Sequence, residues 1–290
     1  MDFGRLLTAM VTPFNQDNRV DFDQTTTLIE YLLSHGTDGL VVAGTTGESP
    51  TLSLQEKLDL FEHVVKIVNG RVPVIAGTGS NNTQASIQLT KEAEAIGVDG
   101  ALLVSPYYNK PNQDGLYHHF STIAKETNLP IMLYNIPSRA VVKMTVETVA
   151  ALAQIENIVS VKDSTGDLDG ISSLLEQVPE DFTVYSGDDS LTLPIQSIGG
   201  TGVVSVSSHI IGNQMKEMIS LFEQGNVAKA AHKHRQLLPV MKALFMAPSP
   251  SPVKAALAYK DIDVGSVRLP LVPLSPFEEQ NLYRLIDQYS

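Results

Sequence analysis

Short apolar runs recur through the first two-thirds of the chain, and a helical pattern follows each of them. Eight runs are rich in β-branched and aliphatic residues, at positions 6–11, 40–43, 74–76, 101–104, 131–134, 158–161, 183–185 and 202–206. Their spacing of roughly 20 to 35 residues suits parallel strands joined by crossover helices. Eight successive units favour closure, so we predict an α/β fold, a (β/α)8 TIM barrel.

Local signals mark where the elements of this barrel begin and end. Segments 36–39 (Gly-Thr-Asp-Gly) and 97–100 (Gly-Val-Asp-Gly) lie where a helix stops and a strand begins, as expected of a glycine in the left-handed conformation. Segments 53–56 and 275–278 are capping boxes, and the first predicts a helix with its apolar face at Leu58, Phe61, Val65 and Val68.

The last part of the chain has a different pattern. After about residue 225 the strand signal disappears, while helical patterns continue around the Pro-Ser-Pro-Ser-Pro segment at 248–252. We therefore expect two domains, a catalytic barrel at 1–224 and a small C-terminal helical domain at 225–290.

Composition and charge exclude several classes of function. The net charge of −12 would repel a phosphate backbone, so nucleic acid and anionic membranes are poor partners. The chain has no cysteine, which excludes a thiolate nucleophile, a disulfide framework and a cysteine metal site. No apolar run reaches the roughly 18 residues of a membrane span. The first residues do not resemble a signal peptide, so we expect a cytoplasmic protein.

Lys162 is the first candidate for catalysis, because active sites of such barrels lie at the carboxyl ends of the strands. It directly follows the apolar run 158–161. Desolvation there lowers the pKa of a lysine, and the less protonated amine can attack a ketone to form an imine, which then acts as an electron sink. The alternative is a lysine paired with Asp163 or another carboxylate at the barrel rim.

Tyr134 ends the preceding run, 131–134, one strand–helix unit before Lys162. Because adjacent strands lie about 4.8 Å apart, the two side chains could meet over the barrel mouth. A phenol there could carry protons during imine formation. The alternative interpretation of Tyr134 is an aromatic plug at the end of the core.

Two further segments offer groups that bind anions. The loop 44–47 (Gly-Thr-Thr-Gly) presents two hydroxyls, Thr45 and Thr46, and free backbone N–H groups suited to a carboxylate, although alone it is only a turn. Arg139 follows the end of run 131–134 and could bind a second carboxylate, although a lone loop arginine is more often part of a surface salt bridge.

Nucleotide and metal sites are poorly supported. Segment 77–82 follows a strand but lacks the third glycine of the dinucleotide fingerprint. His232 and His234 lie two residues apart in a helical stretch, where their side chains diverge.

Taken together, these residues make the chain resemble the dihydrodipicolinate synthase and N-acetylneuraminate lyase family of class I aldolase-like barrels, over essentially its whole length. Segment 39–48 (Gly-Leu-Val-Val-Ala-Gly-Thr-Thr-Gly-Glu) and the stretch from Tyr-Asn-Ile-Pro at 134–137 to Val-Ser-Val-Lys-Asp-Ser at 159–164 match its two signatures. Segments 107–111 and 137–139 resemble the dihydrodipicolinate synthase branch rather than the sialic-acid branch.

The resemblance implies a reaction and no cofactor. Lys162 would condense with pyruvate, and the resulting enamine would attack the aldehyde of aspartate 4-semialdehyde. Cyclisation would then release 4-hydroxy-tetrahydrodipicolinate, in the first committed step of diaminopimelate and lysine biosynthesis.

The resemblance also implies how protons move. Tyr134, Thr45 and Tyr108 would form the proton relay, with Tyr108 supplied by the neighbouring subunit of a tight dimer. A homotetramer built as a dimer of dimers is the assembly that it implies.

The carboxylates of both substrates would be held by other residues of the same pattern. Thr46 would bind the pyruvate carboxylate and Arg139 the carboxylate of the semialdehyde. Gly187 and Val204 would border the pocket through their backbones.

The chain departs from the family pattern in two places. Ala140-Val141 follows Arg139, where Thr-Gly is common, and this affects the loop that aims the arginine. Of the positions associated with inhibition by lysine, Ser49, Asn81 and Tyr107 keep the pattern. Three others, Leu54, Lys57 and Ala85, replace polar or histidine side chains. A cationic Lys57 would repel a lysine effector, so we predict weak or absent inhibition.

Two other functions compete with this interpretation. The first is a sister lyase that cleaves a sugar acid such as N-acetylneuraminate with the same lysine chemistry. Arg139 argues against it, because a polyhydroxylated substrate calls for hydroxyl partners. The second is a barrel that only binds a small molecule, with Lys162 in a salt bridge.

Overall fold

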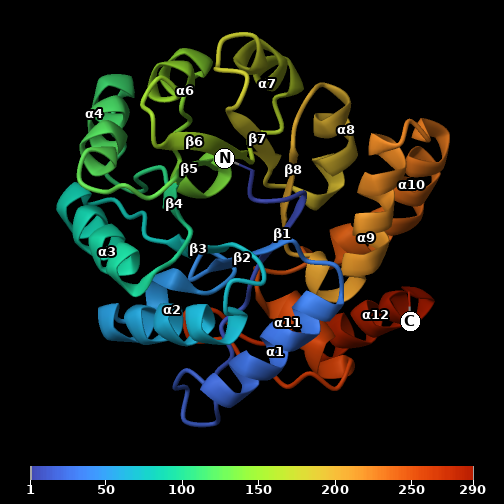
Figure 1. Cartoon of the computed structure of the whole chain (residues 1–290). Coiled ribbons are helices and arrows are strands. Elements are labelled where there is room, and N and C mark those ends of the chain that lie inside the picture. The colour runs from blue at the N-terminus through green and yellow to red at the C-terminus, as the bar shows by residue number, and fades with distance from the viewer. Residues whose placement is uncertain (1, 290) are drawn as a thin grey trace.

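In a computed structural model that describes residues 2–289, eight parallel strands close into a barrel (Figure 1). The strands follow one another around the barrel in chain order, and β8 pairs with β1 to close it. Their bounds are β1 Leu6–Ala9, β2 Gly39–Val42, β3 Val74–Gly77, β4 Gly100–Val104, β5 Ile131–Asn135, β6 Ile158–Asp163, β7 Thr183–Ser186 and β8 Gly202–Ser205. The predicted (β/α)8 barrel is confirmed.

Helices surround the barrel and connect its strands (Figure 1). They are α1 Phe22–Ser34, α2 Leu54–Val68, α3 Thr83–Ile96, α4 Gln113–Ala124, the short α5 Pro137–Ala140, α6 Val146–Leu152, α7 Leu168–Leu175, α8 Thr192–Ser197 and α9 Ser208–Glu223. Two 3-10 helices, η1 Ser49–Thr51 and η2 Asp189–Leu191, lie in the loops after β2 and β7.

The two predicted capping boxes are present at the starts of α2 and α12. The buried face of α2 differs from the predicted one, since it is made by Leu60, Phe61, Val64 and Val68. Leu58 and Val65 are only partly buried against the core. The difference arises because α2 packs on α1 and α3 as well as on β3.

The repeated glycine–aspartate motif joins helix ends to the amino-terminal end of the barrel. Gly36 and Gly97 have φ of 95° and 96°, the left-handed conformation that the motif predicts. The aspartates of the two copies both accept hydrogen bonds from the backbone at the start of a strand. Asp38 Oδ2 accepts hydrogen bonds from the backbone at the start of β1, and Asp99 Oδ2 accepts one from Val74 at the start of β3.

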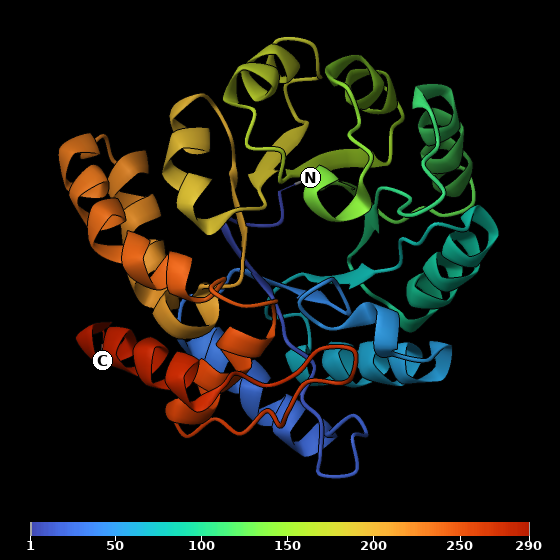
Figure 2. The same ribbon diagram turned by 180° about the vertical axis from the view of Figure 1, so that it is seen from behind.

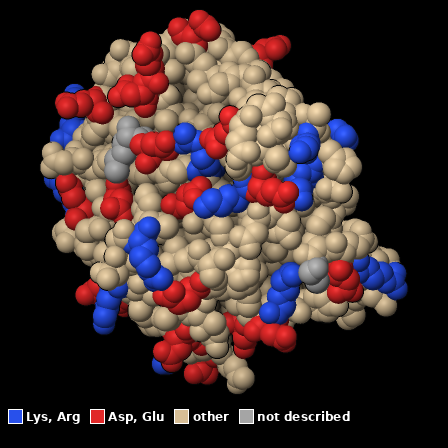
Figure 3. Space-filling view, turned by 45° about the vertical axis from the view of Figure 1, so that its right-hand side comes forward, with Lys and Arg blue, Asp and Glu red and all other residues tan. Residues whose placement is uncertain are grey.

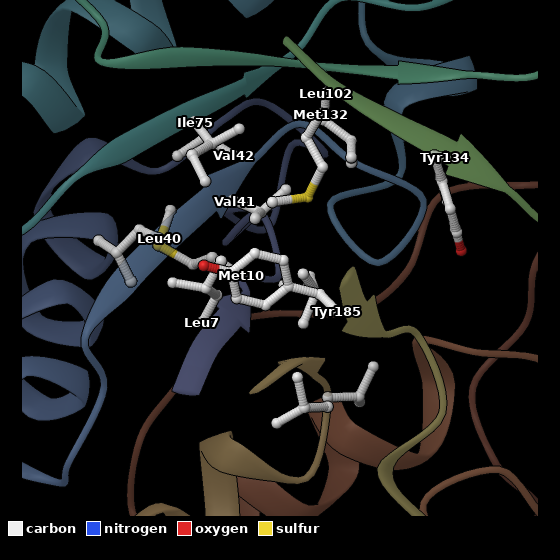
Figure 4. Packing of buried hydrophobic residues seen from close by; sticks show 14 of the residues in the cluster. Leu7, Met10, Leu40, Val41, Val42, Ile75, Leu102, Met132, Tyr134 and Tyr185 are labelled. Atoms are coloured by element: carbon white, nitrogen blue, oxygen red, sulfur yellow. The ribbon is translucent and has the colours of Figure 1, made fainter. Parts of the chain in front are cut away.

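Apolar side chains fill the barrel interior. Figure 4 shows Leu7, Met10, Leu40 and Tyr185 packed together near its centre, while Tyr134 projects from β5 away from this group. Tyr185 is fully buried, and its hydroxyl donates to the carbonyl of Gly4 at 3.0 Å. Each fully buried large side chain of this kind contributes about 1.5–3 kcal/mol to stability. The interior is therefore a packed core that leaves chemistry to the strand ends.

The C-terminal elements are helical, as predicted: α10 Val227–Ala243, α11 Ser251–Tyr259, α12 Pro276–Ile286 and the 3-10 helix η3 Asp287–Tyr289. α10 packs along α9, and α11 packs against α9 and α12. The segment between α11 and α12, red in Figure 2, returns to the barrel beside α2. Its Val264 carbonyl accepts a hydrogen bond from Phe14 N in the loop after β1.

Within residues 2–289, none of the helices has both the length and the apolar character needed to cross a membrane. On the face shown in Figure 3, lysine and arginine side chains are interspersed with aspartate and glutamate, and the described residues of this face form no continuous basic surface.

Candidate active site

A cavity of about 250 Å³ opens at the carboxyl ends of β2 to β5. The predicted residues Thr45, Tyr134 and Arg139 line it together. Its wall also includes residues that motif reasoning placed elsewhere or did not assign, among them Ser49, Lys57, Gly79, Ser80 and Tyr107.

Lys162 and Tyr134 meet at this end of the barrel. They are opposite each other in the register of β5 and β6, and both are nearly fully buried, with exposures of 6% and 4%. Lys162 Nζ lies 4.2 Å from the centre of the Tyr134 ring, a cation–π distance. Tyr134 lines the cavity, whereas Lys162 lies behind the lining residues and contacts the Tyr134 ring.

The salt-bridge alternative for Lys162 is not supported by the geometry. Asp163, the next residue of β6, points to the opposite face of the strand, as alternation requires. Its Oδ1 accepts hydrogen bonds from the backbone N–H and the hydroxyl of Thr165, at 2.8 and 2.6 Å. Burial raises the pKa of Asp163, and the Thr165 hydrogen bonds oppose this shift. Lys162 forms no ion pair with any residue of the described chain.

Gly187, just beyond β7, lies directly beside Lys162. Its N–H donates to the carbonyl of Asp163 at 2.7 Å. A Cβ at this position would be 3.1 Å from Lys162 Cε and only 1.9 Å from Ser164 Oγ. That hydroxyl oxygen is buried and has no hydrogen-bond partner among residues 2–289. A side chain at residue 187 would therefore collide with Ser164 and crowd Lys162, so this position favours glycine.

The loop 44–47 is a tight turn held from both flanks. Glu48 N donates to the carbonyl of Thr45 at 3.1 Å, and Thr12 Oγ1 donates to the carbonyl of Gly47 at 2.7 Å. Thr45 is half-buried and lines the cavity, whereas Thr46 is buried with an exposure of 6%. The residue that ends the turn, Glu48, has the left-handed φ of 56°.

Arg139 lies on α5, is exposed, and faces the cavity. The alternative of a surface salt bridge is not supported, because its guanidinium has no carboxylate partner within residues 2–289. The departure from the family pattern has a visible consequence here. Val141, which ends α5, has a φ of 64° and is 65% exposed, so a β-branched residue occupies a conformation that suits glycine.

Five of the eight predicted residues are not among those that line this cavity: Lys162, Thr46, Gly187, Tyr108 and Val204. Tyr108 is 87% exposed, with a φ of 73°, and its neighbour Tyr107 lines the cavity in its place. Val204 is a buried residue of β8, paired with Leu7 of β1. Lys162 thus lies beside both Tyr134 and Gly187. Thr45 and Arg139 share only the lining of the cavity with Tyr134.

Lys57 also contributes to the cavity wall. This residue of α2 lies on the wall with Ser49 and Tyr107, and burial lowers its pKa. The sequence assigned Lys57 to the neighbourhood of an effector, and gave no signal that this region is continuous with the site around Tyr134. No group of three or more histidine and carboxylate side chains that could hold a metal occurs in residues 2–289.

Comparisons with known proteins agree with this arrangement. The family model described as the dihydrodipicolinate synthetase family matches residues 2–289. The 4-hydroxy-tetrahydrodipicolinate synthase of Bacillus velezensis is 59% identical over 288 residues, which cover 99% of this chain and 100% of the relative. The enzyme of the same name from Bacillus subtilis is 59% identical over 289 residues, with 99% and 100% covered.

Solved structures give the same result. A dihydrodipicolinate synthase from Bacillus anthracis superimposes with a TM-score of 0.98 at 54% identity, covering 100% of this chain and 99% of that one. The enzyme from Cyanidioschyzon merolae, solved with lysine bound, gives a TM-score of 0.97 at 44% identity over 98% and 97% of the two chains. The chain belongs to the dihydrodipicolinate synthetase family.

Proposed function

We propose that this chain condenses pyruvate with aspartate 4-semialdehyde through an imine on Lys162 and releases 4-hydroxy-tetrahydrodipicolinate. The observation that carries the proposal is the environment of the Lys162 side chain. Its ammonium is buried, has no carboxylate partner among the described residues, and lies 4.2 Å from the ring of a tyrosine that lines the cavity. Relatives at 59% identity are named for this synthase activity, which favours it over the sugar-acid lyase.

Imine formation requires two proton transfers. The neutral amine of Lys162 attacks the ketone carbon of pyruvate, and the carbinolamine oxygen must then take up a proton to leave as water. In this proposal Tyr134 gives and accepts these protons, which its contact with Lys162 and its position on the cavity wall support. Thr45, which also lines the cavity, would be the next member of the relay.

Carbon–carbon bond formation follows from the imine. Loss of a proton from the methyl carbon of the bound pyruvate gives an enamine, whose carbon attacks the aldehyde of the semialdehyde. The amino group of the semialdehyde then attacks the imine carbon, which closes the ring and frees Lys162. Every atom of the product comes from the two substrates, and one water leaves.

Local donors must bind the two anions, because the net charge of −12 opposes them. In this proposal Thr46 and the N–H groups of the loop 44–47 hold the pyruvate carboxylate. The unpaired guanidinium of Arg139 holds the carboxylate of the semialdehyde in bidentate fashion. Gly187 and Val204 border the bound pyruvate through their backbones.

The oligomeric assembly and the separate roles of the two domains belong to the same proposal. The exposed ring of Tyr108 would complete the proton relay in a neighbouring subunit, within a homotetramer built as a dimer of dimers. Residues 1–224 would carry the chemistry and 225–290 would form the separate helical domain. A biosynthetic enzyme of this type would act in the cytoplasm.

The test measures product formation from pyruvate with aspartate 4-semialdehyde, and pyruvate release from N-acetylneuraminate. We expect activity only in the first assay. Arg139→Met should raise the KM for the semialdehyde at least tenfold, since a charge-assisted hydrogen-bond pair contributes about 1.5–3 kcal/mol, and leave the KM for pyruvate nearly unchanged. Arg19→Met is the matched control, because Arg19 is also exposed and without an ion pair in the described chain. Cleavage of N-acetylneuraminate without condensation would refute the proposal.

A further inference from the structure

The most deeply buried ion pair in the described chain joins the barrel to the C-terminal helices. Glu48 Oε1 lies 2.8 Å from Lys254 Nζ of α11, and the side chains are only 1% and 3% exposed. The other oxygen of Glu48 accepts a hydrogen bond from the backbone N–H of Arg268 at 2.9 Å. A single carboxylate of the barrel therefore contacts two separate parts of the C-terminal region, α11 and the segment between α11 and α12.

Aromatic and backbone contacts surround this pair. The ring of Phe14 contacts both cations, at 4.2 Å from Lys254 Nζ and 4.2 Å from the guanidinium carbon of Arg268. Lys254 also donates to the carbonyl of Ser266 at 2.8 Å. The Arg268 guanidinium donates to the carbonyl of Thr51 in η1, at 2.8 Å. These contacts fix both cations in place.

Stability alone does not account for the cluster. Removing two charges from water costs several kcal/mol per ion, and replacing a buried pair with well-packed hydrophobic residues of similar volume is often neutral or stabilising. Burial lowers the pKa of Lys254 to about 8, although Glu48 opposes this shift, in line with a large desolvation cost. Because this desolvation cost is large, we expect the Glu48–Lys254 pair to have a role other than stabilising the fold.

The position of Glu48 in the chain indicates that role. It directly follows the loop 44–47 and closes the turn with a hydrogen bond to the carbonyl of Thr45. It does so with φ at 56° and ψ at 36°, a conformation that costs a residue with a side chain roughly 1–2 kcal/mol. An external restraint on the Glu48 side chain offsets this cost and fixes the direction in which the turn leaves β2.

We propose that Glu48 is a positioning residue: Lys254 and the backbone of Arg268 hold its carboxylate, and through it the C-terminal helices set the loop that presents Thr45 and Thr46 to pyruvate. The inference rests on the proposed function for the identity of the ligand. Its structural part, restraint of the loop 44–47 by residues beyond 225, is independent of the reaction.

The test uses the full chain carrying Glu48→Gln together with Lys254→Met. The double variant removes both charges while keeping side-chain size, so no unpaired buried charge remains. We expect its thermal midpoint to stay near that of the wild type, the KM for pyruvate to rise at least tenfold, and deuterium exchange of amides 44–48 to accelerate at least tenfold. Lys233→Met, which breaks the pair of the half-buried Lys233 and the exposed Glu217, is the control for loss of an ion pair elsewhere in the chain and should leave all three unchanged.

The outcomes separate the two proposals. Wild-type KM and wild-type exchange of amides 44–48 in a folded double variant would overturn the positioning role, as would a lower thermal midpoint with both values unchanged. If the double variant does not fold, Glu48→Gln alone decides by the same exchange measurement. Should the wild type fail to act on pyruvate, the proposed function fails, whereas the exchange result still supports or overturns the restraint.

Discussion

Replacing Gly187 with alanine would place a methyl group beside the lysine that we propose forms the imine. The built Cβ lies 1.9 Å from Ser164 Oγ and 3.1 Å from Lys162 Cε, whereas real Cβ atoms essentially never approach closer than 3.0 Å. The serine hydroxyl must therefore retreat by about 1.1 Å, or the segments that follow β6 and β7 must separate. Either adjustment disturbs the surroundings of Lys162 Nζ without touching its chemistry.

The expected size of the effect follows from two general observations. Overpacking of a filled site costs about 1–3 kcal/mol, and misplacing a reacting group by about 1 Å can cost on the order of a hundredfold in rate. We therefore expect Gly187→Ala to lower kcat/KM for pyruvate by roughly 10- to 100-fold, which corresponds to about 1.4–2.7 kcal/mol in the activation free energy.

A second substitution tests the cause. Ser164→Ala removes the atom responsible for the 1.9 Å contact, and the remaining contacts of the new methyl, with Asp163 O and Lys162 Cε, are 3.1 Å. The double variant Ser164→Ala with Gly187→Ala should recover most of the lost activity. Ser164→Ala alone should be nearly neutral, since the buried hydroxyl oxygen has no hydrogen-bond partner in residues 2–289.

The assay is steady-state kinetics at saturating semialdehyde, with far-ultraviolet circular dichroism to establish that each variant is folded. A folded Gly187→Ala enzyme with wild-type kcat/KM would refute the steric reasoning. A double variant no more active than Gly187→Ala would show that the loss does not come from Ser164.

Three further predictions concern the strained loop, the effector region and the acid limit of stability. Val141→Gly should stabilise the fold in urea by about 0.5–1 kcal/mol, because relief of roughly 1–2 kcal/mol of left-handed strain exceeds the entropy cost of glycine; a loss of stability would contradict this. Lysine should inhibit weakly or not at all, because Lys57 lines the cavity, and strong inhibition at micromolar lysine would refute this. Arg268 lowers the pKa of Glu56 to about 2, so stability from this pair is complete above the ordinary pKa of 4.5 and is lost as the pH falls toward 2. The gap in unfolding free energy between the wild type and Glu56→Gln, on the order of 1–3 kcal/mol at pH 6, should therefore close by pH 2, and a constant gap would count against it.

Local sequence patterns were sufficient for the barrel and for the centre of the candidate site. Strand runs, capping boxes and glycine turns are encoded within a few residues, and closure of eight units then brings strand ends together. Because Tyr134 and Lys162 end consecutive strands, their meeting followed from strand spacing alone. The membership of the buried face of α2 did not follow, since it depends on two neighbouring helices.

Other parts of the site depend on contacts that no local pattern reports. In the sequence Glu48 is only the residue that follows a predicted turn, and no neighbouring residue indicates that the backbone of Arg268, 220 residues away, donates a hydrogen bond to it. The steric conflict between residue 187 and Ser164 is equally invisible until β6 and β7 are paired. For Tyr108, the expected destination lies outside a single chain, so neither the sequence nor the chain alone tests it.

The most direct test of the account is reductive trapping. The protein is incubated with pyruvate and borohydride, digested, and mapped by mass spectrometry, with Lys162→Met as the control. We predict a single pyruvate-dependent adduct on Lys162 that blocks activity and is absent from the control. A folded wild-type protein that gives no adduct on Lys162, or gives it on another lysine, would contradict the central claim that this buried, unpaired amine forms the imine.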